Sequence, residues 1–368
     1  MGVFRVLLAI AVFMSHSHDG GAGKLFPIMY RDVLHVYIWS GHAVFAFFVI
    51  SGFYISMVMD QKYVRIESGV WKFYLNRSLR LFPTNWVFLA AFAVYYAVSG
   101  TPSFLAIDVP GADWWAKPAA TFSNIFFVGT EAIPLFNKAN WAYIINAPSW
   151  SLSVEIYFYL LAPFVVCRSL KMLLGLTAIF LGWRVSLYFS GAEAVRWLYF
   201  FAPADFVFFL MGALSYRLYG AIREQMWARY MGPVALLILI GSICFQPFWA
   251  FPSHDQWQSW AFYVTVAVCT PFAFLLTKDS PIDNFIGQLA YPLYIGQVFA
   301  ITLMEHYYSG PVDVPTMSFV VIIVMSVAIY LGVDRPIEKL RHRISRRLSS
   351  DRAGRFTGLT AGSVYVPA

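Results

Sequence analysis

Ten apolar segments constrain the fold of this 368-residue chain more than any other feature of its sequence. A helix needs about 20 mostly apolar residues to cross the hydrocarbon core of a bilayer, and barrel strands are too short to give such continuous runs. Because backbone polar groups inside lipid must be satisfied by the chain itself, we expect an all-α polytopic membrane protein with about ten transmembrane helices. The segments cover about residues 3–18, 34–58, 83–99, 149–167, 171–190, 197–216, 231–249, 259–277, 284–304 and 316–333.

The composition favours a membrane protein over several other classes. Charged residues make up 12% of the chain and its mean hydropathy is +0.63, whereas a soluble domain is about 25% charged. The net charge of +7 is first explained by cytoplasmic loops, so we expect no nucleic-acid partner. Cys167, Cys244 and Cys269 lie in or beside apolar segments, which argues against a disulfide framework. The first segment lacks a small-residue cleavage site, so we expect it to remain as a span.

The distribution of Lys and Arg predicts the orientation. With a cytoplasmic N-terminus and alternating segments, 20 Lys and Arg residues fall on the cytoplasmic side and five on the other. This bias predicts that both termini are cytoplasmic. We expect a membrane domain over residues 1–340 and a basic cytoplasmic tail over 341–368, partly disordered, that contacts anionic lipid. The longest loop, 100–148, holds an apolar piece near 122–128 that is too short to span and is expected to lie at the interface or re-enter.

Two ionisable residues in the first segment point to a ligand. Arg5 and His16 are eleven residues apart, which places both on one helical face about 16 Å apart along the axis. Ionisable groups inside a membrane are costly and are usually functional. The spacing suggests a ligand laid along this helix, with a cation at one end and chemistry at the imidazole. His16 and His18 are two residues apart, which is the wrong spacing for two metal ligands on one helical face, so we expect no metal site.

Five ionisable residues fall at similar depth when positions are counted from the segment ends. Groups of this kind are cheaper to bury together in one polar cavity than separately in lipid, so the count predicts a shared cavity. An equal alternative is structural pairing, with Arg184 and Asp205 as an ion pair between two helices. The five residues are His16, His42, Glu155, Arg184 and Asp205.

A pair of arginines lies before the third segment. Arg77 and Arg80 are three residues apart and share one helical face, and Pro83 is expected to start the next helix. Paired guanidinium groups bind phosphates well through bidentate hydrogen bonds. The alternative is ordinary anchoring by positive residues at the cytoplasmic surface. Arg5 on the same side favours a phosphate site.

Seven motifs in order make the chain resemble a known family. It resembles the integral-membrane acyltransferase 3 family, whose members O-acylate bacterial glycans and other hydroxyl acceptors. Two positions depart from the family pattern, because Gln297 stands where a His is usual and Asp334 where a Glu is usual. The motifs are Arg5 with His16, Phe47–Phe53, Arg77–Pro83, Ser149–Glu155, Phe208–Gly212, Gly287–Tyr294 and Val333–Pro336.

The resemblance implies a reaction and its substrates. The expected enzyme moves an acyl group, most simply acetyl, from cytoplasmic acyl-CoA to a hydroxyl of a surface or secreted glycan or a lipid-linked saccharide. Acyl-CoA is a co-substrate, and no bound cofactor is expected. The expected location is the bacterial inner membrane, where the protein is multi-pass and surrounded by lipid.

The resemblance also implies roles for individual residues. Arg5, Arg77 and Arg80 would hold the CoA phosphates, and Arg5 and His16 would line the catalytic path. His16 would act as general base, oriented by Glu155; transient acylation of His16 is the competing mechanism. Five further residues are expected to support the site or to contact the acceptor. These are His42, Ser151, Asp205, Arg184 and Asp334.

Two other classes of function fit a ten-span chain with buried charge. A transporter or flippase of a lipid-linked glycan often shows two related halves with broken helices, and this sequence shows no such repeat. An inactive relative that scaffolds a polysaccharide assembly is the third alternative, and Gln297 is the residue that favours it.

Overall fold

The computed structural model describes residues 1–17, 40–64, 66, 68–191, 194–244 and 257–341. These parts of the chain are helical and contain no strand. Ten apolar helices match the ten predicted segments. They are α1 (Gly2–His16), α3 (Ser40–Val58), α4 (Gly69–Ser99), α7 (Ser149–Val165), α8 (Leu170–Phe189), α10 (Ala202–Ile222), α11 (Met226–Cys244), α12 (Trp257–Thr277), α13 (Pro281–Tyr307) and α14 (Val314–Ile329).

Length and composition divide these helices into two groups. Among the described helices, eight are long and apolar enough to cross a membrane. The other two are α1 with 15 residues and α7 with 17, so the expected count of about ten transmembrane helices is not confirmed. The chain is therefore a multi-pass membrane protein whose described residues form helices and no strand, while the orientation of its termini stays a prediction. Residues 342–368 of the predicted tail lie outside the described residues.

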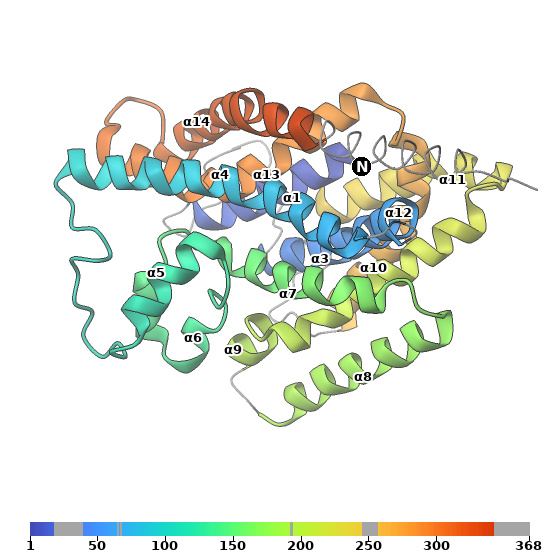
Figure 1. Cartoon of the computed structure of the whole chain (residues 1–368). Helices are drawn as coiled ribbons and strands as arrows, with labels where there is room; N and C mark the ends of the chain where they lie inside the picture. The colour runs from blue at the N-terminus through green and yellow to red at the C-terminus, as the bar shows by residue number, and fades with distance from the viewer. Residues whose placement is uncertain (18–39, 65, 67, 192–193, 245–256, 342–368) are drawn as a thin grey trace, which may run out of the picture.

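The long helices run roughly alongside one another, with α14 along one edge and α8 along the opposite edge (Figure 1). Helix α3 lies in the interior and packs against α1, α7, α10 and α12. At its contact with α10 the two backbones meet at glycines. A Cβ atom on Gly52 would lie 2.1 Å from the carbonyl oxygen of Phe209, and one on Gly212 would lie 2.0 Å from that of Val49. Small residues allow this close approach of membrane helices.

Several helices begin where the sequence provides a cap. The side chains of Ser169, Ser280 and Asp313 each accept the backbone N–H three residues further on, at the starts of α8, α13 and α14. Pro281 follows Ser280 at the first position of α13, where a proline has no N–H to lose. These helix starts are therefore set by local sequence.

The third apolar helix differs from the prediction. Helix α4 extends from Gly69 to Ser99, so Pro83 lies inside it and does not start it. Membrane helices tolerate an internal proline, and one turn of this helix close to Pro83 is tied to α13, because the Tyr291 hydroxyl donates to the Leu81 carbonyl at 2.6 Å. The consequence is that the two arginines before Pro83 belong to the helix itself and not to a preceding loop.

The long loop forms a small unit beside the bundle. It contains α5 (Ala116–Phe126), α6 (Ile133–Phe136) and a 3-10 turn, η3 (Lys138–Tyr143). Figure 1 shows α5 and α6 at one end of the bundle. Helix α5 has 11 residues, so this part of the loop is too short to span, as the sequence predicts.

Candidate active site

An elongated cavity of about 270 Å³ lies among α1, α3, α4, α7 and α13. Residues of α3 from Val44 to Val58 line it, which corresponds to a length of about 21 Å. We call the part lined by Arg5, Arg77 and Arg80 the arginine end. The opposite part, lined by Val44, Phe47, Ser151 and Tyr294, is called the distal end. The cavity thus joins a cationic region to a region with hydroxyl groups.

The arginine end concentrates positive charge. The Arg5 guanidinium lies 5.9 Å from the ring centre of Tyr54, and Arg77 lies 5.6 Å from Phe73 and 5.8 Å from Tyr159. Within the described residues, none of the three arginines forms an ion pair with a carboxylate. The Nε atom of Arg77 is buried and has no hydrogen-bond partner there. The three cations repel one another, and the nearby Glu155 offsets only part of their charge, so this end has the electrostatic character that suits a polyanion.

Two carboxylates border the cavity, and both are already hydrogen-bonded. Glu155 on α7 accepts from the hydroxyl groups of Ser51 and Tyr159, the latter at 2.6 Å. Asp283 on α13 accepts from the backbone N–H groups of Gly2 at 2.7 Å and Val3 at 3.0 Å. These bonds satisfy two backbone N–H groups in the first turn of α1 that have no partner within the helix. Asp283 therefore fixes the start of the helix that carries Arg5.

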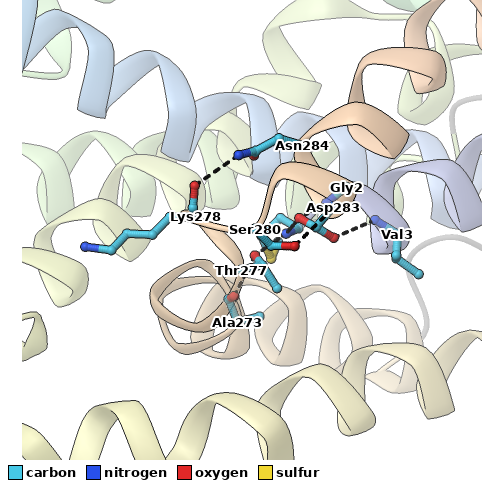
Figure 2. Close-up of polar contacts among 9 residues, drawn as sticks. Gly2, Val3, Ala273, Thr277, Lys278, Ser280, Asp283 and Asn284 are labelled. Carbon is cyan, nitrogen blue, oxygen red and sulfur yellow. Dashed lines mark hydrogen bonds and ion pairs between the residues drawn. The ribbon is translucent and has the colours of Figure 1, made fainter.

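Figure 2 shows this junction between the turn after α12 and the start of α1. The Met1 amine is also bonded to Asp283 and to the Thr277 hydroxyl. A Cβ atom on Gly2 would lie 1.7 Å from the Asp283 carbonyl oxygen, so α1 and α13 touch backbone to backbone here. The position of Arg5 in the cavity thus depends on a close contact between two helices far apart in the sequence.

His16 lies at the other end of α1 and does not line the cavity. Its Nδ1 atom is 2.9 Å from the Val12 carbonyl oxygen. Glu155 is bonded to Ser51, which is one turn from Tyr54, the residue beneath Arg5. Glu155 is therefore at the level of Arg5, about 16 Å along α1 from His16. The structure does not bring Glu155 to His16, so the predicted orientation of the imidazole by Glu155 is wrong.

The distal end nevertheless reaches the level of His16. Helix α1 starts beside Gly287 of α13, and its Phe13 contacts Phe319 of α14. Phe319 is one turn from Ile322 on α14, and Ile322 contacts Gly296 of α13. The start of α1 therefore lies beside Gly287 of α13 and its end lies near Gly296, so α1 and α13 run in the same direction. The cavity extends about 15 Å from Tyr54 to Val44, close to the 16 Å between Arg5 and His16.

His42 lies apart from the cavity. Its Nε2 atom is 2.9 Å from the Ser259 hydroxyl, and its ring stacks on Tyr263 at 5.9 Å. His42 is nine residues, or about 13 Å, along α3 from Ser51, the partner of Glu155.

Arg184 and Asp205 form a buried ion pair between α8 and α10. The Arg184 Nη1 atom donates to Asp205 Oδ1 at 2.9 Å, and the side chains are 1% and 0% exposed. The guanidinium lies 4.9 Å from the rings of Phe45 and Phe208. This is the structural pairing that the sequence left open. Of the five residues predicted to share one cavity, only Glu155 lines the main one, so that prediction is wrong.

The other two predicted supporting residues lie at opposite ends of the site. Ser151 lines the distal end, where its hydroxyl is 2.6 Å from that of Tyr294. Asp334 accepts from the Thr84 hydroxyl at 2.5 Å and lines a second cavity of about 30 Å³ beyond Arg80. Asp334 ends η5 (Tyr330–Asp334), a π-helical turn that continues α14. Segments of this kind are frequent at functional sites.

A family model described as an acyltransferase domain matches residues 1–333. The chain belongs to this acyltransferase family. The match confirms the resemblance inferred from the seven motifs.

Curated relatives include the O-acetyltransferase OatA of Staphylococcus aureus strain NCTC 8325 / PS 47 and that of strain COL. Each is 24% identical to this chain over 325 residues, a region that covers 80% of this chain and 52% of the relative. The chain therefore spans about half the length of the curated relatives it matches. No solved structure matches the chain.

Sequence reasoning on this acyltransferase-family chain missed Tyr159 and Asp283. Tyr159 lies four residues after Glu155 on α7, and Ser151 lies four residues before it, so the three share one helical face. That spacing could have identified Tyr159 as a site residue from the sequence. Asp283 has no comparable signal, because its partners Gly2 and Val3 are about 280 positions away in the chain.

Buried polar atoms without partners gather near the distal end. Among the described residues these include Asn146 Oδ1, Ser149 Oγ and Gln297 Oε1. The Asn146 amide donates to the Ile295 carbonyl at 2.7 Å, and Gln297 lies one turn beyond Tyr294 on α13. Buried acceptors are costly when unbonded. These atoms lie close to the distal end, but their residues do not line the cavity.

Proposed function

We propose that this chain is a membrane O-acyltransferase that moves an acyl group, most simply acetyl, from acyl-CoA to a hydroxyl of a glycan or lipid-linked saccharide. Membership of the acyltransferase family and similarity to an O-acetyltransferase support the reaction class. We place the enzyme in a bacterial inner membrane, with the arginine end toward the cytoplasm. The bias of Lys and Arg toward that side supports this orientation.

The observation that carries the proposal is the arginine end of the cavity. Three guanidinium groups that form no ion pair with a carboxylate among the described residues face a passage about 21 Å long. A CoA thioester has the matching shape, with phosphates at one end and a long, uncharged arm that ends in the acyl group. The phosphates bind the arginines, and the arm lies along α3 toward the distal end.

The transfer step takes place at the depth of His16 in the membrane. The imidazole takes the proton of the acceptor hydroxyl as its oxygen attacks the thioester carbonyl carbon. The carbon–sulfur bond then breaks, and the CoA thiolate leaves and recovers the proton from the imidazolium. Transient acylation of His16 remains the competing route, in which the imidazole attacks first and the acceptor second. Glu155, bonded to Ser51 and Tyr159, shapes the passage near the arginines and takes no part in orienting His16.

The test is acyl transfer by purified protein in liposomes with labelled acetyl-CoA on one side and a glycan acceptor on the other. We expect His16→Ala to abolish transfer and to leave CoA binding within about twofold of wild type, because His16 does not line the cavity. A matched control is Lys171→Gln on the exposed start of α8, which should transfer normally. Transfer by His16→Ala at the wild-type rate would remove the proposed base. Glycan movement without acyl transfer would favour the flippase, and neither activity would favour a scaffold.

A further inference from the structure

A second, smaller cavity adjoins the arginine end. It has a volume of about 30 Å³ and shares lining residues with the main cavity. Because both cavities are lined by Arg80, a group bound in the second cavity would lie next to a ligand at the arginine end. The shared residues are Arg80, Gln288 and Tyr291, and the second cavity adds Asp334, Glu338 and Arg341.

Arg341 is held in a defined position in this second cavity. Its Nε atom donates to Asn76 Oδ1 at 2.6 Å, and the Asn76 amide donates to the Tyr63 hydroxyl at 2.6 Å. In the described part of the chain, Arg341 forms no ion pair with a carboxylate. The terminal nitrogens of the guanidinium are therefore available for a planar, two-point contact with an oxyanion.

Two acids in the same cavity offset part of this charge without forming an ion pair with Arg341. Asp334 is engaged by the Thr84 hydroxyl. Glu338 lies three residues before Arg341 on the same helical stretch, yet the two do not form an ion pair. Glu338 repels any anion bound beside it, so its neutralisation is expected to strengthen anion binding.

We propose that Arg341, together with Arg80, binds a second phosphate group of the donor, set apart from the phosphates held by Arg5 and Arg77. This inference rests on the proposed function, in which the donor is acyl-CoA. In that molecule the separate group is the phosphomonoester on the 3′ position of the ribose. The same chemistry is offered by a lipid headgroup phosphate, which the experiment distinguishes.

The experiment is equilibrium binding of CoA and of 3′-dephospho-CoA to the full chain in nanodiscs of neutral lipid. Wild type is expected to bind CoA roughly tenfold more tightly, the effect of one charge-assisted contact at a partly exposed site. Arg341→Gln should lose this preference by weakening CoA alone, and Glu338→Gln should increase it. Arg335→Gln removes the same charge from an exposed position nearby and should change nothing.

Three other outcomes would overturn the inference, each in a recognisable way. If Arg341→Gln weakens both ligands equally, the residue does not contact the 3′-phosphate. If its effect arises only in nanodiscs that contain phosphatidylglycerol, the partner is a lipid headgroup. If wild type binds neither ligand, the proposed donor is wrong as well, whereas CoA binding without acyl transfer would challenge only the proposed reaction.

Discussion

Replacing Arg80 by Gln is expected to stabilise the ligand-free protein and to weaken CoA binding. Arg80 is half-buried between the two cavities, and its electrostatic neighbours include Arg5, Arg77 and Arg341. Its attraction to Asp334 opposes these repulsions. Among the described residues Arg80 makes no ion pair that the substitution would remove.

The magnitude follows from the balance of charges. Two unit charges about 8 Å apart interact by about 2 kcal/mol at an effective dielectric constant of about 20. Solvent screening of a half-buried group reduces this to about 0.5 kcal/mol for each pair. Three repulsions against the attraction of Asp334 leave a gain of at most about 1 kcal/mol in the free energy of unfolding, because Glu155 and Glu338 line the same two cavities and reduce it. For a chain of this size that gain raises the Tm by about 1–2 °C.

Ligand binding should change in the opposite direction. Loss of one charge-assisted contact weakens binding roughly tenfold. At a CoA concentration one hundred times the wild-type Kd, bound ligand stabilises wild type by about 2.7 kcal/mol and the variant by about 1.4 kcal/mol. Thermal unfolding in detergent at one scan rate, with and without CoA, measures both effects. A ligand-free Arg80→Gln protein with a lowered Tm, or one that binds CoA as tightly as wild type, would refute the reasoning.

Two further predictions concern packing and pH. Gly212→Ala should destabilise the protein by about 1–3 kcal/mol, because the new Cβ atom meets the Val49 carbonyl oxygen of α3. Gly220→Ala on the same helix has open space and serves as the control; equal Tm values for the two variants would contradict the close contact. Burial raises the pKa of the Glu131 carboxyl in the long loop, while hydrogen bonds from Ser153 and Tyr157 oppose the shift. A raised pKa in the folded state stabilises the protein below the ordinary pKa of about 4.5, and this contribution is lost as the pH rises through the folded-state pKa. The Tm of Glu131→Gln should therefore exceed the Tm of wild type by more at pH 8 than at pH 4.5. A difference in Tm that does not depend on pH would refute the burial argument.

The sequence predicted the parts of the site that depend on local spacing. The alignment of Arg5 and His16 on one helix, and of Arg77 and Arg80 on another, follows from helical periodicity alone. All three arginines line one cavity, although Arg77 and Arg80 lie within α4 and not before it. The family assignment followed from motifs in their order along the chain, and the match over residues 1–333 confirms it.

The predicted depth of the ionisable residues in the membrane was wrong for Glu155. Counting from segment ends placed Glu155 beside His16, His42, Arg184 and Asp205. The count assumes that every segment crosses the full bilayer, but α1 and α7 have only 15 and 17 residues. The start of α1 is also buried against α13, with Met1 only 2% exposed.

The sequence by itself determined ten apolar helices, several of their caps and the clusters of charge along each helix, because hydropathy and spacing are local properties. Only the tertiary structure decided which of these clusters meet. The registers between helices are set by backbone contacts such as Gly52 with Phe209 and Gly2 with Asp283. Such contacts depend on the shapes of two distant segments at once. They bring Glu155 to the arginines, separate the Arg184–Asp205 pair from the cavity, and place Arg341 beside Arg80.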